Sequence, residues 1–302
     1  MSSSLPSAPA WMTDALRYIP ESRSVDVEGC AIHYLCWNPK ATDKPPLLLA
    51  HGFCAHAHWW DVTVPALLEH YRVVALDFSG MGDSGHREHY SHPQYCREIV
   101  AVIEAENLTP VNLVGHSFGG LVSIQTTARF PDKVQSLTVI DSRISLPRNG
   151  DETPSRGASE LRSKRVYPTL EQAMARFRLI PEENCTDPAL FAHVARGSLR
   201  EQDGGWVWKF DDRITQTLEP VEVPEADLLP KITCPTAFIF GEHSIVAPRE
   251  MAEKTVAYMA NGRAPIEIAD AHHHVLLDQP LVMREALVTL LAELRAGKSG
   301  KD

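Results

Sequence analysis

The sequence has no hydrophobic run long enough to span a membrane, no block of clustered basic residues and no cysteine pair at C-x-x-C spacing. A membrane-spanning helix needs about 20 apolar residues, and nucleic-acid binding needs concentrated positive charge. With a formal net charge of -10, we expect no membrane and no nucleic acid as partner. The six scattered cysteines indicate reduced thiols. The N-terminus lacks the features of a signal peptide, so we expect a cytoplasmic protein.

What the 302 residues do contain is a series of short apolar runs that alternate with longer amphipathic stretches. This alternation is typical of an α/β fold with a mostly parallel sheet and crossover helices. The pattern predicts strands at 25–27, 32–37, 47–51, 72–77, 111–116, 136–140, 236–241 and 264–268. Helical spacing of apolar residues predicts helices at 93–106, 118–130 and 281–295. We expect the first two strands to form an antiparallel hairpin at one edge.

The series of strands is interrupted between residues 147 and 229. This stretch is charged, contains prolines and shows helical fragments at 170–179 and 188–199. Because strands resume at residue 236, the interruption is best explained as an insertion. We therefore predict a core domain made of residues 1–146 and 230–302, with a helical cap formed by residues 147–229.

The strongest chemical signal is the pentapeptide from Gly115 to Gly119, which reads G-H-S-F-G. It follows an apolar strand and precedes a predicted helix, which is the setting that a G-x-S-x-G nucleophile elbow requires. Such an elbow presents the hydroxyl of Ser117 at the end of a strand. A purely structural serine is the alternative, and the strand–turn–helix setting favours the nucleophile.

A serine hydroxyl needs a base within hydrogen-bond reach, and the base needs an orienting acid. Three consecutive histidines, His272 to His274, lie between the last predicted strand and the last helix. A metal-binding cluster is the alternative, but no acid or cysteine stands at a ligand spacing beside them. We therefore expect the base among these histidines, with no metal and no cofactor.

Several motifs, in order along the chain, resemble the α/β-hydrolase superfamily from about residue 47 to residue 291. They are His51-Gly52-Phe53, the segment 77–84, the G-H-S-F-G-G elbow, Phe240-Gly241-Glu242 and the histidine-rich segment that ends in Asp278-Gln279-Pro280. The resemblance implies an eight-stranded, mostly parallel sheet flanked by helices, with an inserted cap. In similar enzymes the catalytic histidine stands seven residues before the closing proline, which identifies His273.

The catalytic acid departs from the common pattern of this superfamily. Relatives usually carry an aspartate at the position of Ser244, and a serine cannot balance the charge of an imidazolium. Haloalkane dehalogenases instead supply the acid after the strand that follows the nucleophile helix, where this chain has Asp141. We predict Asp141 as the acid, with Glu242 as the second candidate. The alternative role for Asp141 is to cap a turn or helix.

The remaining site residues follow from the same resemblance. Backbone N–H groups of Phe53 and Phe118 are expected to form the oxyanion hole. Aromatic residues at alternate positions in the insertion would share one face of an extended segment. We assign the substrate pocket to these aromatic residues and to side chains near the nucleophile: Trp59, His116, Trp206 and Trp208. Packing of the aromatic residues within the cap is an equally good explanation.

These residues predict a serine hydrolase that cleaves a carboxylic ester of a small apolar acyl substrate through an acyl-enzyme. Carbon–carbon bond hydrolysis of a diketone or ring-cleavage product uses similar residues and is an alternative. A non-catalytic receptor or scaffold with this fold is another, because the usual acid is missing at Ser244. Dehalogenase and epoxide hydrolase chemistry are disfavoured, since similar enzymes of those types carry aspartate where Ser117 stands.

Overall fold

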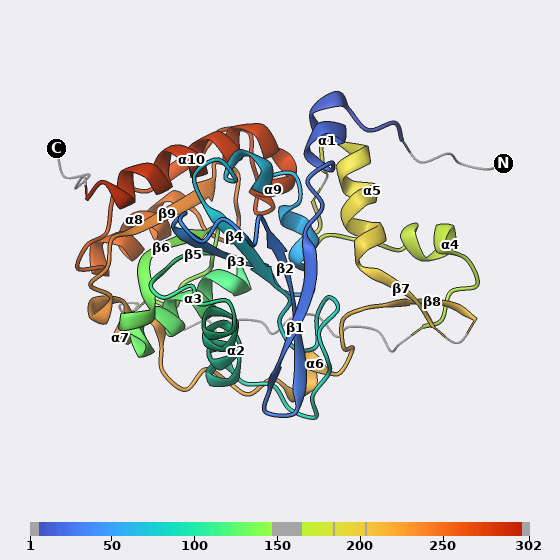
Figure 1. The fold of residues 1–302 in the computed structure, drawn as a ribbon, viewed down its shortest axis with the longest axis horizontal. Coiled ribbons are helices and arrows are strands. Elements are labelled where there is room, and N and C mark those ends of the chain that lie inside the picture. Colours follow the sequence, from blue (N-terminus) through green and yellow to red (C-terminus); the bar gives the residue numbers. More distant parts are fainter. Residues whose placement is uncertain (1–5, 147–164, 184, 203, 298–302) are drawn as a thin grey trace.

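The computed structural model describes residues 6–146, 165–183, 185–202 and 204–297. Its centre is an eight-stranded sheet with the strand order β1-β2-β4-β3-β5-β6-β9-β10 (Figure 1). The first two strands form the antiparallel hairpin expected at one edge, and the neighbours from β4 to β10 are parallel. The strands are β1 (Glu21–Val27), β2 (Cys30–Trp37), β3 (Pro46–Ala50), β4 (Arg72–Leu76), β5 (Val111–His116), β6 (Val134–Ile140), β9 (Thr236–Gly241) and β10 (Ile266–Ile268). The predicted strand series and sheet are confirmed.

Helices cover both faces of this sheet. Consecutive residues of β3 alternate between two apolar clusters, one on each face. Leu48 packs into the first, Leu47 and Leu49 pack into the second, and all three are fully buried. Side chains of a strand alternate between faces, so a strand buried on both sides must be apolar throughout. The first cluster contains residues of α2 (His92–Ala105) and α3 (Phe118–Arg129), and the second contains residues of α10 (Pro280–Arg295).

Local signals explain where these helices begin and end. Ser91 caps α2, since its side chain accepts a hydrogen bond from the backbone N–H of Gln94. α3 ends at Arg129, just before Pro131, which cannot continue a helix. Helix α8 (Arg249–Tyr258) was not predicted, because it buries only Ala252 and Thr255 and has no clear apolar stripe.

Between β6 and β9 the chain leaves the sheet, and we call its described part, residues 165–229, the cap segment. It contains both helices and a hairpin: α4 (Leu170–Met174), α5 (Pro188–Gly197), β7 (Leu199–Gln202), β8 (Gly205–Trp208), α6 (Ile214–Thr217) and α7 (Glu225–Leu228). The antiparallel β7–β8 hairpin is a difference from the helical cap that we predicted. The predicted start of the cap at residue 147 lies outside the described residues, so the division into core and cap domains stays a prediction.

A third apolar cluster joins the cap segment to the core. Met12 of the N-terminal helix α1 (Ala10–Ala15) packs there with Trp59 of the core and with Leu190 of α5. Figure 1 shows α1 beside α5. The N-terminal helix therefore helps to hold the cap segment on the core.

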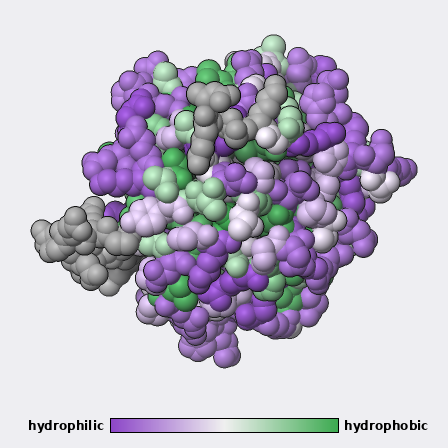
Figure 2. Space-filling view, turned by 90° about the vertical axis from the view of Figure 1, so that its left-hand side faces the viewer, coloured by the Kyte–Doolittle hydropathy of each residue, from purple (hydrophilic) through white to green (hydrophobic). Residues whose placement is uncertain are grey.

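The face in Figure 2 is mostly hydrophilic, and its hydrophobic residues are scattered in small groups. None of the helices in the described ranges is both long and apolar enough to cross a bilayer. The six cysteines, all of which lie within the described residues, are free thiols.

Candidate active site

Ser117 lies in the sharp turn between β5 and α3, with φ 53° and ψ −117°. A positive φ is strained for a residue with a side chain and marks the nucleophile elbow. The turn is possible because glycines stand two residues before and two residues after Ser117. A Cβ at Gly115 would lie 2.4 Å from the carbonyl oxygen of Gly119, and a Cβ at Gly119 would lie 2.5 Å from that of Ala50. The elbow expected from the motif is thus present in its geometry.

His273 and Asp141 come together at the carboxyl ends of β6 and β10, which flank β9 in the sheet. Asp141 directly follows β6, and His273 follows β10. Nδ1 of His273 lies 2.8 Å from Oδ1 of Asp141, and both side chains are buried. Both oxygens of Asp141 also accept hydrogen bonds from other donors, which favours the ionised carboxylate. With an acceptor on that side, Nδ1 carries the proton and Nε2 is left as the basic nitrogen.

Ser117, the predicted nucleophile, is joined to this pair through the residue that precedes it. His116, the residue before Ser117, bonds the backbone carbonyl of His273 through Nε2 at 3.0 Å, and the two rings lie 5.0 Å apart. Within the described part of the chain, no hydrogen bond links the hydroxyl of Ser117 to His273. Such bonds are often long in an enzyme without substrate and tighten in the complex.

The Asp141 carboxylate is held by two further donors. The Ser244 hydroxyl donates to Oδ1 at 2.6 Å, and the Gly241 N–H donates to Oδ2 at 2.8 Å. Glu242, the second candidate for the acid, is partly exposed and accepts a hydrogen bond from the N–H of Asp270 instead. Of the two candidates, Asp141 is therefore the one that the structure brings to His273.

Burial shifts the pKa of both members of the pair. Removal from water disfavours a charge, so it lowers the pKa of His273 and raises that of Asp141. The donors at Ser244 and Gly241 oppose the shift at Asp141. A histidine with a lowered pKa is neutral near pH 7, which is the state that can take a proton from a hydroxyl.

The loop of Phe53 lies against the elbow. A Cβ at Gly52 would lie 3.4 Å from Cβ of Ser117, and the rings of Phe53 and Phe118 are 5.6 Å apart. His51 accepts the N–H of Phe78 at Nε2, so its Nδ1–H donates to the carbonyl of Gly52 at 2.7 Å. This bond fixes the peptide that carries the Phe53 N–H. Among the described residues, neither this N–H nor that of Phe118 has a hydrogen-bond partner, as donors reserved for an oxyanion require.

A cavity of about 180 Å³ lies between this loop and the cap segment. Its lining is Phe53, Cys54, Trp59, Arg176, Phe177, Arg178, Leu179, Ile180, Ser198, Trp208, Phe210 and His274. Two of the predicted pocket residues, Trp59 and Trp208, are in this lining, and two are not. The guanidinium of Arg196 lies over the Trp206 ring, 4.6 Å from the ring centre. His116 bonds the backbone of His273.

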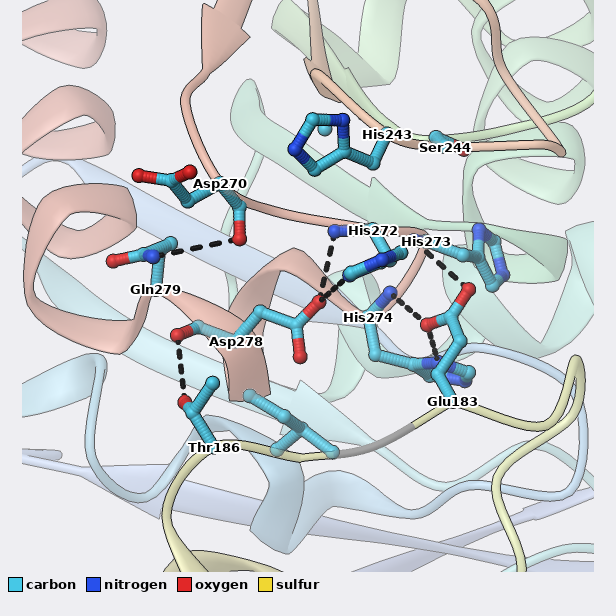
Figure 3. A network of polar contacts seen from close by, with 12 residues as sticks. Glu183, Thr186, His243, Ser244, Asp270, His272, His273, His274, Asp278 and Gln279 are labelled. Atoms are coloured by element: carbon cyan, nitrogen blue, oxygen red, sulfur yellow. Dashed lines mark hydrogen bonds and ion pairs between the residues drawn. The ribbon is translucent and has the colours of Figure 1, made fainter.

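No sequence pattern indicates Glu183, which reaches from the cap segment to residues 269–274, the loop between β10 and α9. We call this loop the catalytic loop because it carries the predicted base, His273. The Glu183 carboxylate bonds His274 and the backbone of His273 (Figure 3). An isolated glutamate in a charged stretch carries no signal of this kind. The role of Ser244 could have been inferred, because it occupies the position of the usual acid.

Two groups of side chains in the described residues are close enough to share a cation. One is His33, Asp77 and Asp83, and the other is the exposed set Glu242, His243 and Asp270. In the first group the Asp77 carboxylate already accepts from His33 and from the N–H groups of Ala57 and Asp83. Neither group includes a residue of the proposed catalytic set.

Comparison with known proteins agrees with this fold. A family model that describes the alpha/beta hydrolase fold matches residues 45–280. The chain belongs to the α/β-hydrolase family. This α/β hydrolase is 25% identical over 276 residues to a serine hydrolase-like protein of Danio rerio, covering 84% of this chain and 83% of that protein.

Other relatives are also hydrolases by name. Esterase Rv0045c of Mycobacterium tuberculosis is 33% identical over 191 residues, which covers 61% of this chain and 62% of that esterase. A crystal structure of Rv0045c superposes with a TM-score of 0.72 at 23% identity, over 96% of this chain and 100% of that one. The thioesterase domain of the curacin pathway gives a TM-score of 0.72 at 23% identity, over 90% and 99% of the two chains. The structural likenesses establish the fold, and the family and its relatives support hydrolase activity.

Proposed function

We propose that this α/β hydrolase cleaves a carboxylic ester, or a related acyl bond, through an acyl-enzyme on Ser117. The observation that carries the proposal is the buried Asp141–His273 pair, with its 2.8 Å hydrogen bond, beside a serine in a strained elbow. An orienting acid, a neutral base and an exposed hydroxyl are the parts that acyl transfer needs.

In the first half of the reaction, Nε2 of His273 takes the proton of the Ser117 hydroxyl, and the serine oxygen bonds the substrate carbonyl carbon. The N–H groups of Phe53 and Phe118 hold the resulting oxyanion, and one such donor contributes about 3 kcal/mol. The tetrahedral intermediate then expels the alcohol, which leaves with the proton from His273.

In the second half, His273 takes a proton from water as the water oxygen attacks the acyl carbon. Collapse of this second intermediate returns the proton to Ser117 and releases the carboxylic acid. Asp141 keeps the imidazole oriented and stabilises its positive charge in both halves. These steps use side chains and backbone only, so the proposal includes no cofactor.

The cavity supports an acyl chain of moderate size with an apolar body. Phe53, Trp59 and Trp208 offer apolar walls, while Arg176 and Arg178 are exposed lining residues and so mark its open side. No aspartate or glutamate is in the described lining. The proposal therefore favours substrates whose far end is neutral or negative over those whose far end is positive.

The proposal is tested with a fluorophosphonate probe and a panel of p-nitrophenyl esters, comparing the wild-type protein with Ser117→Ala. We expect the probe to label the wild type and not Ser117→Ala, and ester turnover of the variant to fall to background. The panel, with chains that end in a methyl, carboxylate or ammonium group, defines the substrate class. Full turnover by Ser117→Ala would refute the proposal.

A further inference from the structure

A second carboxylate–imidazole pair lies beside the first. Oε2 of Glu183, in the cap segment, lies 2.6 Å from Nδ1 of His274, and both side chains are buried. The rings of His273 and His274 are 4.9 Å apart. The catalytic loop is thus bonded to Asp141 of the core through His273. It is bonded to Glu183 of the cap segment through the next residue, His274.

Glu183 also bonds the backbone of the base. Oε1 accepts the N–H of His273 at 3.2 Å, and Oε2 accepts the N–H of His274 at 3.2 Å (Figure 3). Successive N–H groups that converge on one carboxylate fix the backbone conformation between them. Hydrogen bonds to an ionised acceptor are also about twice as strong as neutral ones.

The Glu183 carboxylate stays ionised in this position. Burial alone would raise its pKa, but the hydrogen bond from His274 and the two backbone N–H groups outweigh burial, so the pKa is lowered. The charged carboxylate of Glu183 therefore contacts the catalytic loop across the neutral pH range.

Neighbouring residues of the cap segment join the same loop. The Cys185 thiol lies 3.6 Å from the carbonyl oxygen of Leu277. The Thr186 hydroxyl donates to the carbonyl oxygen of Asp278 at 3.1 Å (Figure 3). Both acceptors belong to the short helix α9 (Val275–Asp278), which directly follows the histidines. Side chains of the cap segment thus hold the loop from residue 273 to residue 278.

We propose that Glu183 is a positioning residue, which holds the backbone of His273 so that Nε2 faces Ser117 while the cap segment is seated on the core. Asp141 orients the ring from the core side, and Glu183 orients its backbone from the cap side. His273 is then correctly positioned only when the cap segment packs on the core. This inference rests on the proposed role of Ser117 and His273.

The test compares Glu183→Ala and Glu183→Gln with the matched control Glu182→Gln. Glu182 is the adjacent glutamate, and its side chain is 82% exposed. For each protein we would measure the rate constant of fluorophosphonate labelling, kcat and KM for p-nitrophenyl acetate, and the thermal unfolding midpoint. Labelling reports the alignment of serine and base with little dependence on the acyl pocket.

We expect both Glu183 variants to lose about 10-fold to 100-fold in labelling rate and kcat, with KM nearly unchanged, because a displaced catalytic group costs this much. Glu183→Gln has no charge and carries an NH2 donor in place of one acceptor oxygen, so it cannot accept at both positions where the Glu183 oxygens now meet the two N–H groups. In Glu183→Ala, added formate or acetate can occupy the vacated carboxylate position and should restore part of the lost rate. Glu182→Gln should behave as the wild type, with or without the added anion.

A folded Glu183→Ala that labels at the wild-type rate would overturn the inference. So would a loss confined to KM, which would limit Glu183 to shaping the pocket wall at His274. A loss that follows the unfolding midpoint and is not restored by formate or acetate would show a structural role only. In each of these cases a wild type that labels at Ser117 leaves the proposed function standing, whereas a wild type that fails to label refutes the function itself.

Discussion

The Ser244 hydroxyl donates a 2.6 Å hydrogen bond to the Asp141 carboxylate. Ser244 stands where the resemblance to other α/β hydrolases leads one to expect the catalytic acid. In this chain a carboxylate stands at the end of β6 instead, and position 244 supplies a donor to it. The same oxygen of Asp141 bonds His273, so Ser244, Asp141 and His273 form one hydrogen-bonded row.

Replacing the acid should harm activity far more than replacing the nearby glutamate. We expect Asp141→Asn to lower kcat/KM for an activated ester by about 10³-fold to 10⁴-fold, because an asparagine can stabilise the wrong tautomer of His273. Glu242→Gln should stay within about twofold of the wild type, since surface changes away from a site have small effects. Steady-state kinetics of the two variants tests this ranking. A larger loss of kcat/KM in Glu242→Gln than in Asp141→Asn would identify Glu242 as the acid.

An aspartate at position 244 should take over the role of the acid when Asp141 is replaced by asparagine. In the Asp141→Asn background, Ser244→Asp places a carboxylate where the Ser244 hydroxyl now meets Asp141, close to Nδ1 of His273. We expect it to recover at least about tenfold in kcat, which is roughly 1.4 kcal/mol of transition-state stabilisation. Ser244→Asn in the same background is the control and should recover nothing. Equal rates for the two double variants would show that the position cannot reach the base.

The pH dependence of activity should reflect the burial of His273. Burial lowers its pKa below the ordinary value of 6.5, and the base acts only in its neutral form. Activity should therefore persist below pH 6.5 and fall only as the pH drops through the lowered pKa. A profile of kcat/KM against pH, with stability checked at each pH, tests this. An acid limb centred at or above pH 6.5 would contradict it.

The elbow glycines should be needed for stability as well as for turnover. Alanine at Gly115 or Gly119 brings a Cβ within 2.5 Å of backbone atoms, so the strand or the helix must shift. We expect a loss of about 1–3 kcal/mol in the free energy of unfolding, measured by urea denaturation. Gly204→Ala is the control for strain without crowding, because its φ is +75° and a Cβ there would meet nothing within 4 Å. Elbow variants no less stable than this control would be inconsistent with the crowding argument.

Local signals predicted the sheet, from its apolar strand runs, and the elbow, from the spacing of Gly115 and Gly119 around Ser117. The three histidines could be located from sequence order alone, but resemblance to relatives was needed to choose His273 among them. The link between Asp141 and His273 spans 132 residues, and resemblance to relatives rather than local pattern suggested it. The catalytic roles themselves remain predictions.

Contacts made by the cap segment could not be predicted in the same way. Glu183 is 90 residues from His273 in sequence, and no periodic pattern joins the two. The β7–β8 hairpin was missed because its first strand directly follows α5, so the helical pattern was extended to Leu199. Trp206 and Trp208 were predicted to share a face of an extended segment, yet only Trp208 lines the cavity, because Trp206 packs against Arg196.

The packing of α1 against Trp59 has a practical consequence for handling this protein. Met12 and Trp59 belong to one apolar cluster, and Trp59 also lines the cavity. An affinity tag or immobilisation surface joined near the start of the chain would pull on a helix that packs in the same apolar cluster as a residue of the cavity wall. Attachment after Arg295, at the end of α10, would leave that wall undisturbed, since Figure 1 shows the C-terminal end of α10 far from α1.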